Sequence, residues 1–285
     1  MRIVRAVSEL RDAVASRRAS GGQVGLVPTM GAFHEGHIAL MRRSRERCGF
    51  TVVSLFVNPA QFNEPSDLEQ YPRDEARDAA LGEQAGVDIL FAPPVAAVYP
   101  AGFATTVEVH GLTERLEGAV RGTAHFRGVA TVVTKLLGMV TPDVAFFGQK
   151  DAQQSLVIQR LVEDLDLDVE IEICPTVREA DGLAMSSRNA RLDAAGRVRA
   201  TSISRALFTM DALVAAGNRS ASRVLQAGRA ILGAADIQPE YLVAVSADGL
   251  EDVTRLDGRV LIAVAARVGT VRLIDNVIVD SRALA

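Results

Sequence analysis

Two histidines lie where a predicted strand gives way to a predicted helix, a position that suits chemistry on a negatively charged ligand. The segment reads Val-Pro-Thr-Met-Gly-Ala-Phe-His-Glu-Gly-His over residues 27–37, so His34 and His37 stand at the helix start. The first amides of a helix have no partners within it, and the helix dipole is positive there. Imidazoles at this point favour a polyphosphate ligand such as a nucleoside triphosphate.

Two other interpretations of these histidines compete with a phosphate site. A zincin needs a His-Glu-x-x-His motif so that both imidazoles share one helix face, whereas His34 and His37 are only three residues apart. The spacing therefore disfavours zinc. The second alternative is a loop whose imidazoles merely hydrogen-bond the backbone, which a single histidine would favour.

Lysine is scarce in this chain, which draws attention to Lys150. Of 31 basic residues only Lys135 and Lys150 are lysines. A lysine carries a compact charge on a flexible stem, which suits contact with phosphate. In Gly148-Gln149-Lys150-Asp151 it stands between a predicted strand and a helix, where ammonium and amides can reach the same phosphates. Asp151 either caps that helix or accepts hydrogen bonds from a ribose.

A third cluster contains hydroxyls and a guanidinium. It reads Met185-Ser186-Ser187-Arg188-Asn189 and follows a predicted turn at residues 181–182. Such donors suit a departing pyrophosphate. Neither Gly-x-x-x-x-Gly-Lys-Ser/Thr nor a Gly-x-Gly-x-x-Gly after the first strand occurs, so phosphate must be held by other means.

The elements that must position these residues alternate between strand and helix. We predict strands at 23–27, 50–57, 87–92, 144–147 and 169–173, and helices at 36–47, 74–86, 129–140 and 151–165. This alternation indicates an α/β fold with a Rossmann-like doubly wound parallel sheet. Segments 28–37, 58–62 and 148–154 all follow predicted strands, so we expect them to converge on one cleft.

The pattern changes after about residue 188. Predicted helices at 194–216 and 221–235 precede strands at 237–245, 260–266 and 271–278. We therefore expect two domains, residues 1–176 with the parallel sheet and residues 177–285 as a smaller C-terminal α+β domain.

Composition limits the class of protein. Hydrophobic residues make up 48% of the chain and charged residues 23%, with a formal net charge of −4 and no basic cluster beyond short pairs such as Arg42-Arg43. A globular protein with a small ligand is expected, without a nucleic-acid surface. No apolar run suggests a membrane span and the start shows no secretory signal, so we expect a cytoplasmic protein. Cys48 and Cys174 are isolated, which favours reduced thiols.

Several motifs together resemble the pantothenate synthetase family, over almost the whole chain. The segments are Pro28–His37, Ser54–Phe62, Tyr71–Arg73, Gly148–Gln154, Val177–Asn189 and Arg272–Asn276. His34–His37 is also similar to the His-x-Gly-His signature of the wider nucleotidyl-transferring superfamily, and Met185–Arg188 to its mobile phosphate-binding loop.

The resemblance implies an ATP-dependent ligase that condenses pantoate with β-alanine through a pantoyl adenylate and releases pyrophosphate and AMP. It also implies Mg²⁺ with ATP, and a homodimer. Because a carboxylate is already ionised near neutral pH, its attack on the α-phosphorus requires no general base. For His37 two roles stay open, protonating a leaving group or donating a hydrogen bond.

The resemblance also assigns residues. It implies ATP binding by Met30, Gly31, Ala32, Phe33, His34, Glu35, Gly36, His37, Gly148, Gln149, Lys150, Asp151, Val177, Met185, Ser186, Ser187 and Arg188. Among these, the catalytic residues would be His37, His34, Lys150 and Arg188. Gln61 and Gln154 would hold pantoate, with Gln61 also near β-alanine. Asp78 is the magnesium ligand that it suggests, the alternative being a solvent-facing helix residue.

The chain departs from the family pattern at three places, one of which is Ala152, where relatives often carry an aromatic residue. Gln149 stands where relatives usually carry a glutamate, and one extra residue before His125 loosens the alignment there. Two other functions therefore compete with the ligase. One is another His-x-Gly-His adenylyl- or cytidylyltransferase, and the other is a nucleotide-binding protein without turnover.

Overall fold

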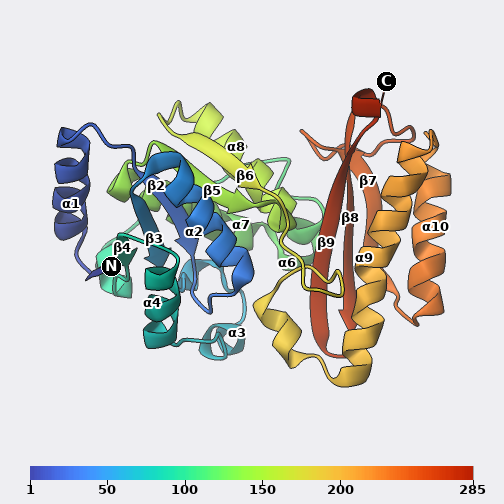
Figure 1. The fold of residues 1–285 in the computed structure, drawn as a ribbon, viewed down its shortest axis with the longest axis horizontal. Helices are drawn as coiled ribbons and strands as arrows, with labels where there is room; N and C mark the ends of the chain where they lie inside the picture. The colour runs from blue at the N-terminus through green and yellow to red at the C-terminus, as the bar shows by residue number, and fades with distance from the viewer. Residues whose placement is uncertain (285) are drawn as a thin grey trace. The chain divides into compact units, whose positions relative to one another are not determined.

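The computed structural model describes residues 1–284, and the chain divides into two compact units (Figure 1). The first consists of Met1–Gly148 and Gln153–Pro175, and the second of Gln149–Ala152 and the chain from Thr176 onward. The chain thus passes between units at Pro175–Thr176, beside the predicted boundary at 176. The short segment Gln149–Ala152, which contains Lys150, groups with the second unit.

The first unit is built on a six-stranded sheet whose paired strands all run parallel. Its order is β1-β4-β3-β2-β5-β6. The strands are β1 Arg2–Val4, β2 Gly25–Thr29, β3 Thr51–Leu55, β4 Ile89–Phe91, β5 Val144–Gly148 and β6 Glu170–Cys174. This order confirms the predicted doubly wound α/β fold. The strand order reverses between β2 and β5, and ligands bind at the carboxyl ends of strands beside such a switch point.

Helices cover both faces of this sheet. Helices α1 (Val7–Ala19), α7 (Thr123–Val140) and α8 (Ala152–Asp164) share one apolar core with the strands. Helices α2 (Glu35–Cys48) and α4 (Glu75–Gln84) belong to a second core. The repeat of apolar residues at helical spacing predicts α7, whose face is buried as expected. Short helices α3 (Pro65–Glu69), α5 (Val95–Val98) and α6 (Glu117–Arg121) occupy the connections.

The sequence patterns did not predict β1 and α1. Strand β1 has three residues at the sheet edge, and its Ile3 is exposed, so no buried apolar run marks it. In α1 only Leu10 and Val14 are buried, which leaves a weak helical periodicity.

The second unit contains the predicted smaller α+β fold. Its antiparallel sheet has the order β7-β8-β9, with β7 Pro239–Ser246, β8 Arg259–Val268 and β9 Val271–Asp280. Helices α9 (Ala194–Ala215) and α10 (Ala221–Ala234) share a core with these strands (Figure 1). In neither unit does a described helix combine the length and apolar character needed to cross a bilayer.

Candidate active site

The histidine motif forms a reciprocal cap on helix α2. His34 is the N-cap residue, and its Nδ1 accepts a hydrogen bond from the Gly36 amide at 3.2 Å. Three residues on, His37 Nδ1 accepts from the His34 amide at 3.4 Å, and the two ring centroids lie 4.2 Å apart. The Gly36 amide, which has no acceptor within the helix, is thus satisfied by the cap. Both imidazoles hydrogen-bond the backbone, as the second of the two alternatives predicted.

These caps determine which edge of each imidazole carries the proton. A ring nitrogen that accepts a hydrogen bond is unprotonated, so the proton of each neutral ring stands on Nε2. An Nε2–H group is a donor. The capped helix start thus combines two imidazole donors with the positive end of the α2 dipole, an arrangement that suits an anion.

The loop before these histidines is shaped by Asp78 of helix α4. Asp78 Oδ2 accepts the Ala32 amide at 2.7 Å and Oδ1 accepts the Phe33 amide at 2.8 Å. The loop backbone is left-handed at Gly31 (φ 90°) and at Ala32 (φ 53°). A Cβ on Gly31 would stand 2.7 Å from Leu55 Cδ1 and 2.9 Å from Asp78 Oδ2, so only glycine fits.

Asp78 does not fit the role of a magnesium ligand. Its side chain is 1% exposed, and each carboxylate oxygen already accepts a backbone amide. The alternative of a solvent-facing helix residue is wrong, because Asp78 is buried. Within residues 1–284 no group of three or more His, Cys, Asp or Glu side chains is placed to hold a metal ion.

Gln61 is oriented by a buried asparagine, Asn58, which follows strand β3 and caps the short 3-10 helix Pro59–Gln61. Asn58 is 1% exposed, and its Nδ2 donates to Gln61 Oε1 at 3.0 Å and to the Gly128 carbonyl at 3.1 Å. Its Oδ1 accepts the Tyr99 hydroxyl at 2.8 Å. Burial raises the pKa of Tyr99 to about 12, which keeps that hydroxyl a donor. Because Gln61 Oε1 faces Asn58, Gln61 Nε2 is the atom that can donate to a ligand.

His125 and Gln154 also lie in the first unit. His125 Nδ1 donates to the Gln61 carbonyl at 2.8 Å, which places the imidazole beside this glutamine despite the extra residue. Gln154 is half-buried in the first turn of α8. Its neighbour Gln153 has a structural role instead, because its side chain hydrogen-bonds the backbone of Leu112, Arg115 and Glu117.

In the second unit, strand β9 holds the turn that carries Lys150. Asn276 Nδ2 donates to the Gln149 carbonyl at 2.9 Å and to the Lys150 carbonyl at 3.0 Å, while Gln149 Nε2 donates to Asn276 Oδ1 at 3.3 Å. The Lys150 side chain is 17% exposed, with Nζ 3.9 Å from Asp151 Oδ1. Among described residues Asp151 makes no capping hydrogen bond, so the capping interpretation is not observed.

The segment with the two serines is a folded loop of the same unit. The Met185 amide donates to the Val177 carbonyl at 2.9 Å, and Ser186 Oγ accepts the Arg188 amide at 3.3 Å. Arg197 bonds Glu179 Oε2 at 2.7 Å, and this hydrogen bond holds the pKa of Glu179 below its ordinary value. The loop is thus braced at its base, while the Arg188 side chain is exposed.

A buried ion pair ties this loop to β9. Arg178 donates to both oxygens of Asp275, at 2.7 Å and 3.0 Å. Burial raises the pKa of the Asp275 carboxyl, and the hydrogen bonds from Arg178 oppose that shift. Sequence reasoning assigned no role to Asp275 or Asn276. The available signal was a polar pair between two apolar runs of the strand, since such a pair needs internal partners.

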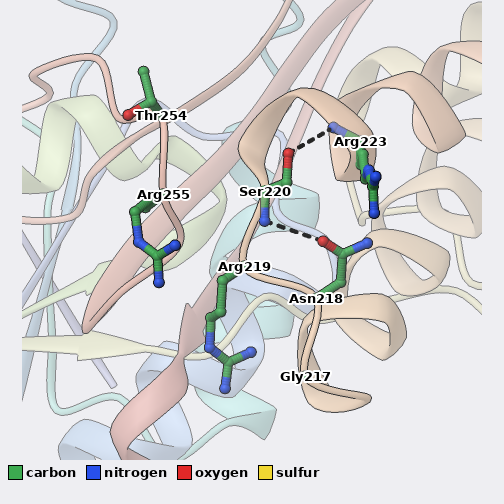
Figure 2. A pocket seen from close by; sticks show the side chains of 7 residues that line it. All are labelled: Gly217, Asn218, Arg219, Ser220, Arg223, Thr254 and Arg255. Carbon is green, nitrogen blue, oxygen red and sulfur yellow. Dashed lines mark hydrogen bonds between the residues drawn. The ribbon is translucent and has the colours of Figure 1, made fainter.

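A cavity of about 470 Å³ lies elsewhere in the second unit, between the start of α10 and residues 254–255 (Figure 2). Arg219, Arg223 and Arg255 line it, but none of the predicted site residues does. Arg255 bonds Asp257 at 2.8 Å, and Arg219 bonds the Val214 carbonyl at 2.6 Å. Two of its three guanidinium groups are therefore engaged internally, and we do not assign the active site to this cavity.

We expect Gln149→Glu to reduce stability more than turnover. The change replaces the donor that faces Asn276 Oδ1 with an acceptor, which costs about 1 kcal/mol in the free energy of unfolding. The Asn276 bonds to the two carbonyls persist, so kcat should change less than about threefold, or under roughly 0.7 kcal/mol. Urea unfolding and steady-state kinetics check both parts. A tenfold fall in kcat would show that the amide at position 149 is needed for turnover.

Comparison with known proteins gives one consistent family. The family model described as Pantoate-beta-alanine ligase matches residues 2–278. A pantothenate synthetase of Cereibacter sphaeroides (strain ATCC 17029) is 52% identical over 275 residues, covering 96% of this chain and 98% of that protein. One from Rhizorhabdus wittichii is 51% identical, covering 98% and 99%.

Solved structures agree in fold. Pantothenate synthetase from Thermus thermophilus superposes with a TM-score of 0.91 at 46% identity, covering 97% of this chain and 99% of that one. A pantoate-beta-alanine ligase from Francisella tularensis, complexed with beta-gamma ATP and beta-alanine, has a TM-score of 0.78 at 31% identity. It covers 99% of this chain and 98% of that one.

Proposed function

The chain belongs to the pantoate-beta-alanine ligase family, whose members join pantoate to β-alanine with ATP, and we propose that it does so through a pantoyl adenylate. One observation supports this proposal most directly. The histidine-capped start of α2 and the loop braced by Asp78 follow β2, at the switch point of the sheet. That is where an α/β sheet binds its ligand, and the groups there are donors.

In the first step, a pantoate carboxylate oxygen attacks the α-phosphorus of ATP and pyrophosphate leaves. The carboxylate is ionised at neutral pH, so the protein must position the reactants and stabilise charge, not remove a proton. His34 and His37 would donate from Nε2 to phosphate oxygens. Lys150, Ser186, Ser187 and Arg188 of the second unit would add cations and hydroxyls for the departing pyrophosphate.

Binding of the nucleotide and of pantoate would use the remaining residues that the resemblance assigns. Residues 30–37 and 148–151 would contact ATP together with Val177 and Met185. Gln61 Nε2 would donate to pantoate, because its carbonyl oxygen is held by Asn58. Gln154 would supply the second amide. Neutral amides satisfy hydroxyl and carboxylate oxygens without a large charge penalty.

In the second step, the neutral amine of β-alanine attacks the acyl carbonyl, the bond from that carbon to the AMP oxygen breaks, and the nitrogen releases one proton to solvent. His37, whose Nδ1 accepts the His34 amide, would act on the leaving AMP from Nε2, either by donating a hydrogen bond or by giving up a proton. We propose that Mg²⁺ accompanies ATP and is held by phosphate oxygens, since Asp78 is committed to two amides. We assign no step to it.

A homodimer in the cytoplasm is proposed from the resemblance, and light scattering would test its mass.

Isotope exchange tests the function. We expect labelled pyrophosphate to enter ATP only when pantoate is present, and AMP to appear only when β-alanine is added as well. Exchange with another acceptor, and none with pantoate, would instead identify a related adenylyltransferase. Nucleotide binding without any AMP or pyrophosphate would identify a protein without turnover.

A further inference from the structure

Strand β9 carries two adjacent polar residues in a setting where polar side chains are costly. Asp275 and Asn276 are each 3% exposed and lie in a strand of the second unit's core sheet. Buried polar groups persist where hydrogen bonds satisfy them. The hydrogen-bond partners of Asp275 and Asn276 therefore indicate what this pair does. These partners all lie within the second unit.

Asn276 uses its side-chain amide to hold the backbone around Lys150. Its Nδ2 donates to the Gln149 and Lys150 carbonyls at 2.9 Å and 3.0 Å. Two carbonyl acceptors leave only one orientation for the amide, with Nδ2 toward the turn. Gln149 Nε2 supports that orientation by donating to Oδ1 at 3.3 Å.

Asp275 holds Asn276 in place and links it to the serine-containing loop. Asp275 Oδ1 accepts a hydrogen bond from the backbone amide of Asn276 at 2.8 Å, and the same carboxylate forms an ion pair with Arg178. Arg178 in turn donates to the Gly182 carbonyl at 3.1 Å, and its Cζ lies 4.8 Å from the centroid of the Phe208 ring. The lysine turn and the loop are thus fixed to neighbouring residues of one strand.

We propose that Asn276 is a positioning residue for Lys150, holding the backbone of the Gln149–Asp151 turn so that the ammonium is aimed at the phosphates of ATP. Lysine has a flexible side chain, so a fixed backbone at its root limits the volume that Nζ samples. This inference rests on the proposed role of Lys150 in adenylation. It predicts an effect confined to the step that Lys150 serves.

A double-mutant cycle with Lys150→Ala tests the proposal. We expect Asn276→Ala to slow adenylation about tenfold in the wild-type background but less than about twofold in the Lys150→Ala background, because its effect passes through the ammonium. The second half-reaction, from preformed pantoyl adenylate and β-alanine to AMP, should keep its wild-type single-turnover rate. A general folding defect would lower both half-reactions alike.

Controls separate this inference from the function on which it rests. Asn218→Ala removes another asparagine of the same unit, one that accepts the Ser220 amide in a loop, and should leave both half-reactions unchanged. Should Asn276→Ala not fold, Asn276→Asp keeps its shape but, when ionised, cannot donate to the carbonyls, and we expect the same pattern. A wild-type rate for Lys150→Ala would overturn the role of Lys150 itself. A slow Lys150→Ala with equal Asn276→Ala effects in both backgrounds would overturn only the positioning role.

Discussion

Replacing Lys150 by alanine should lower the rate of adenylation by about 10²-fold or more, a loss of roughly 2.7 kcal/mol of transition-state stabilisation. The displaced pyrophosphate gains charge as the bond breaks, and a fixed ammonium stabilises that charge more than it stabilises ground-state ATP. The fold should survive, because the two Asn276 bonds to this turn use backbone carbonyls that alanine retains. Single-turnover formation of the adenylate at saturating ATP and pantoate measures the effect.

The other lysine of the chain provides a matched control. Lys135 Nζ lies 4.4 Å from the centroid of the Phe103 ring, a cation–π contact worth about 0.5–1 kcal/mol of stability. Lys135→Ala removes the same charge and should change adenylation less than about twofold. If both variants adenylate at the wild-type rate, Lys150 has no role in the transition state. If both are equally slow, net charge and not position explains the effect.

The elements with a strong repeat of apolar residues were predictable from sequence, because each of them buries an apolar face in a core. In α7 the apolar face repeats over the whole helix, and in β5 every residue up to Phe147 is buried. The doubly wound order followed from alternating strands and helices, since parallel strands need crossover connections. Strand β1 and helix α1 bury little apolar surface and gave no comparable signal.

The residue types of the candidate site are visible in the sequence, but the orientations of their side chains are not. The sequence located His34 and His37 at a helix start, yet only the three-dimensional structure shows that both Nδ1 atoms accept backbone hydrogen bonds, from which we infer a proton on each Nε2. Likewise Asn276 lies 126 residues from Lys150 in the chain, and a hydrogen bond to a backbone carbonyl leaves no side-chain motif to detect. Such long-range partners depend on the tertiary fold.

Asp78→Ala should destabilise the first unit by about 3 kcal/mol and weaken ATP binding, through the loop and not through a metal. The change leaves the part-buried amide of Ala32 and the buried amide of Phe33 without acceptors, at about 1–3 kcal/mol each. The left-handed backbone at Gly31 and Ala32 would then relax, and the loop would lose its shape beside the histidines. Urea unfolding without ligands and the KM for ATP measure the two effects.

A magnesium titration distinguishes the loop anchor from a metal ligand. If Asp78 bound Mg²⁺ directly, raising the metal concentration would restore activity to the alanine variant, and its stability without ligands would be normal. The anchoring role predicts the reverse, a lowered unfolding midpoint that no metal concentration corrects. Asp74→Ala is the matched control on α4, because that carboxylate only caps the helix at the Arg77 amide. Its loss should cost about 1 kcal/mol of stability and leave the KM for ATP unchanged.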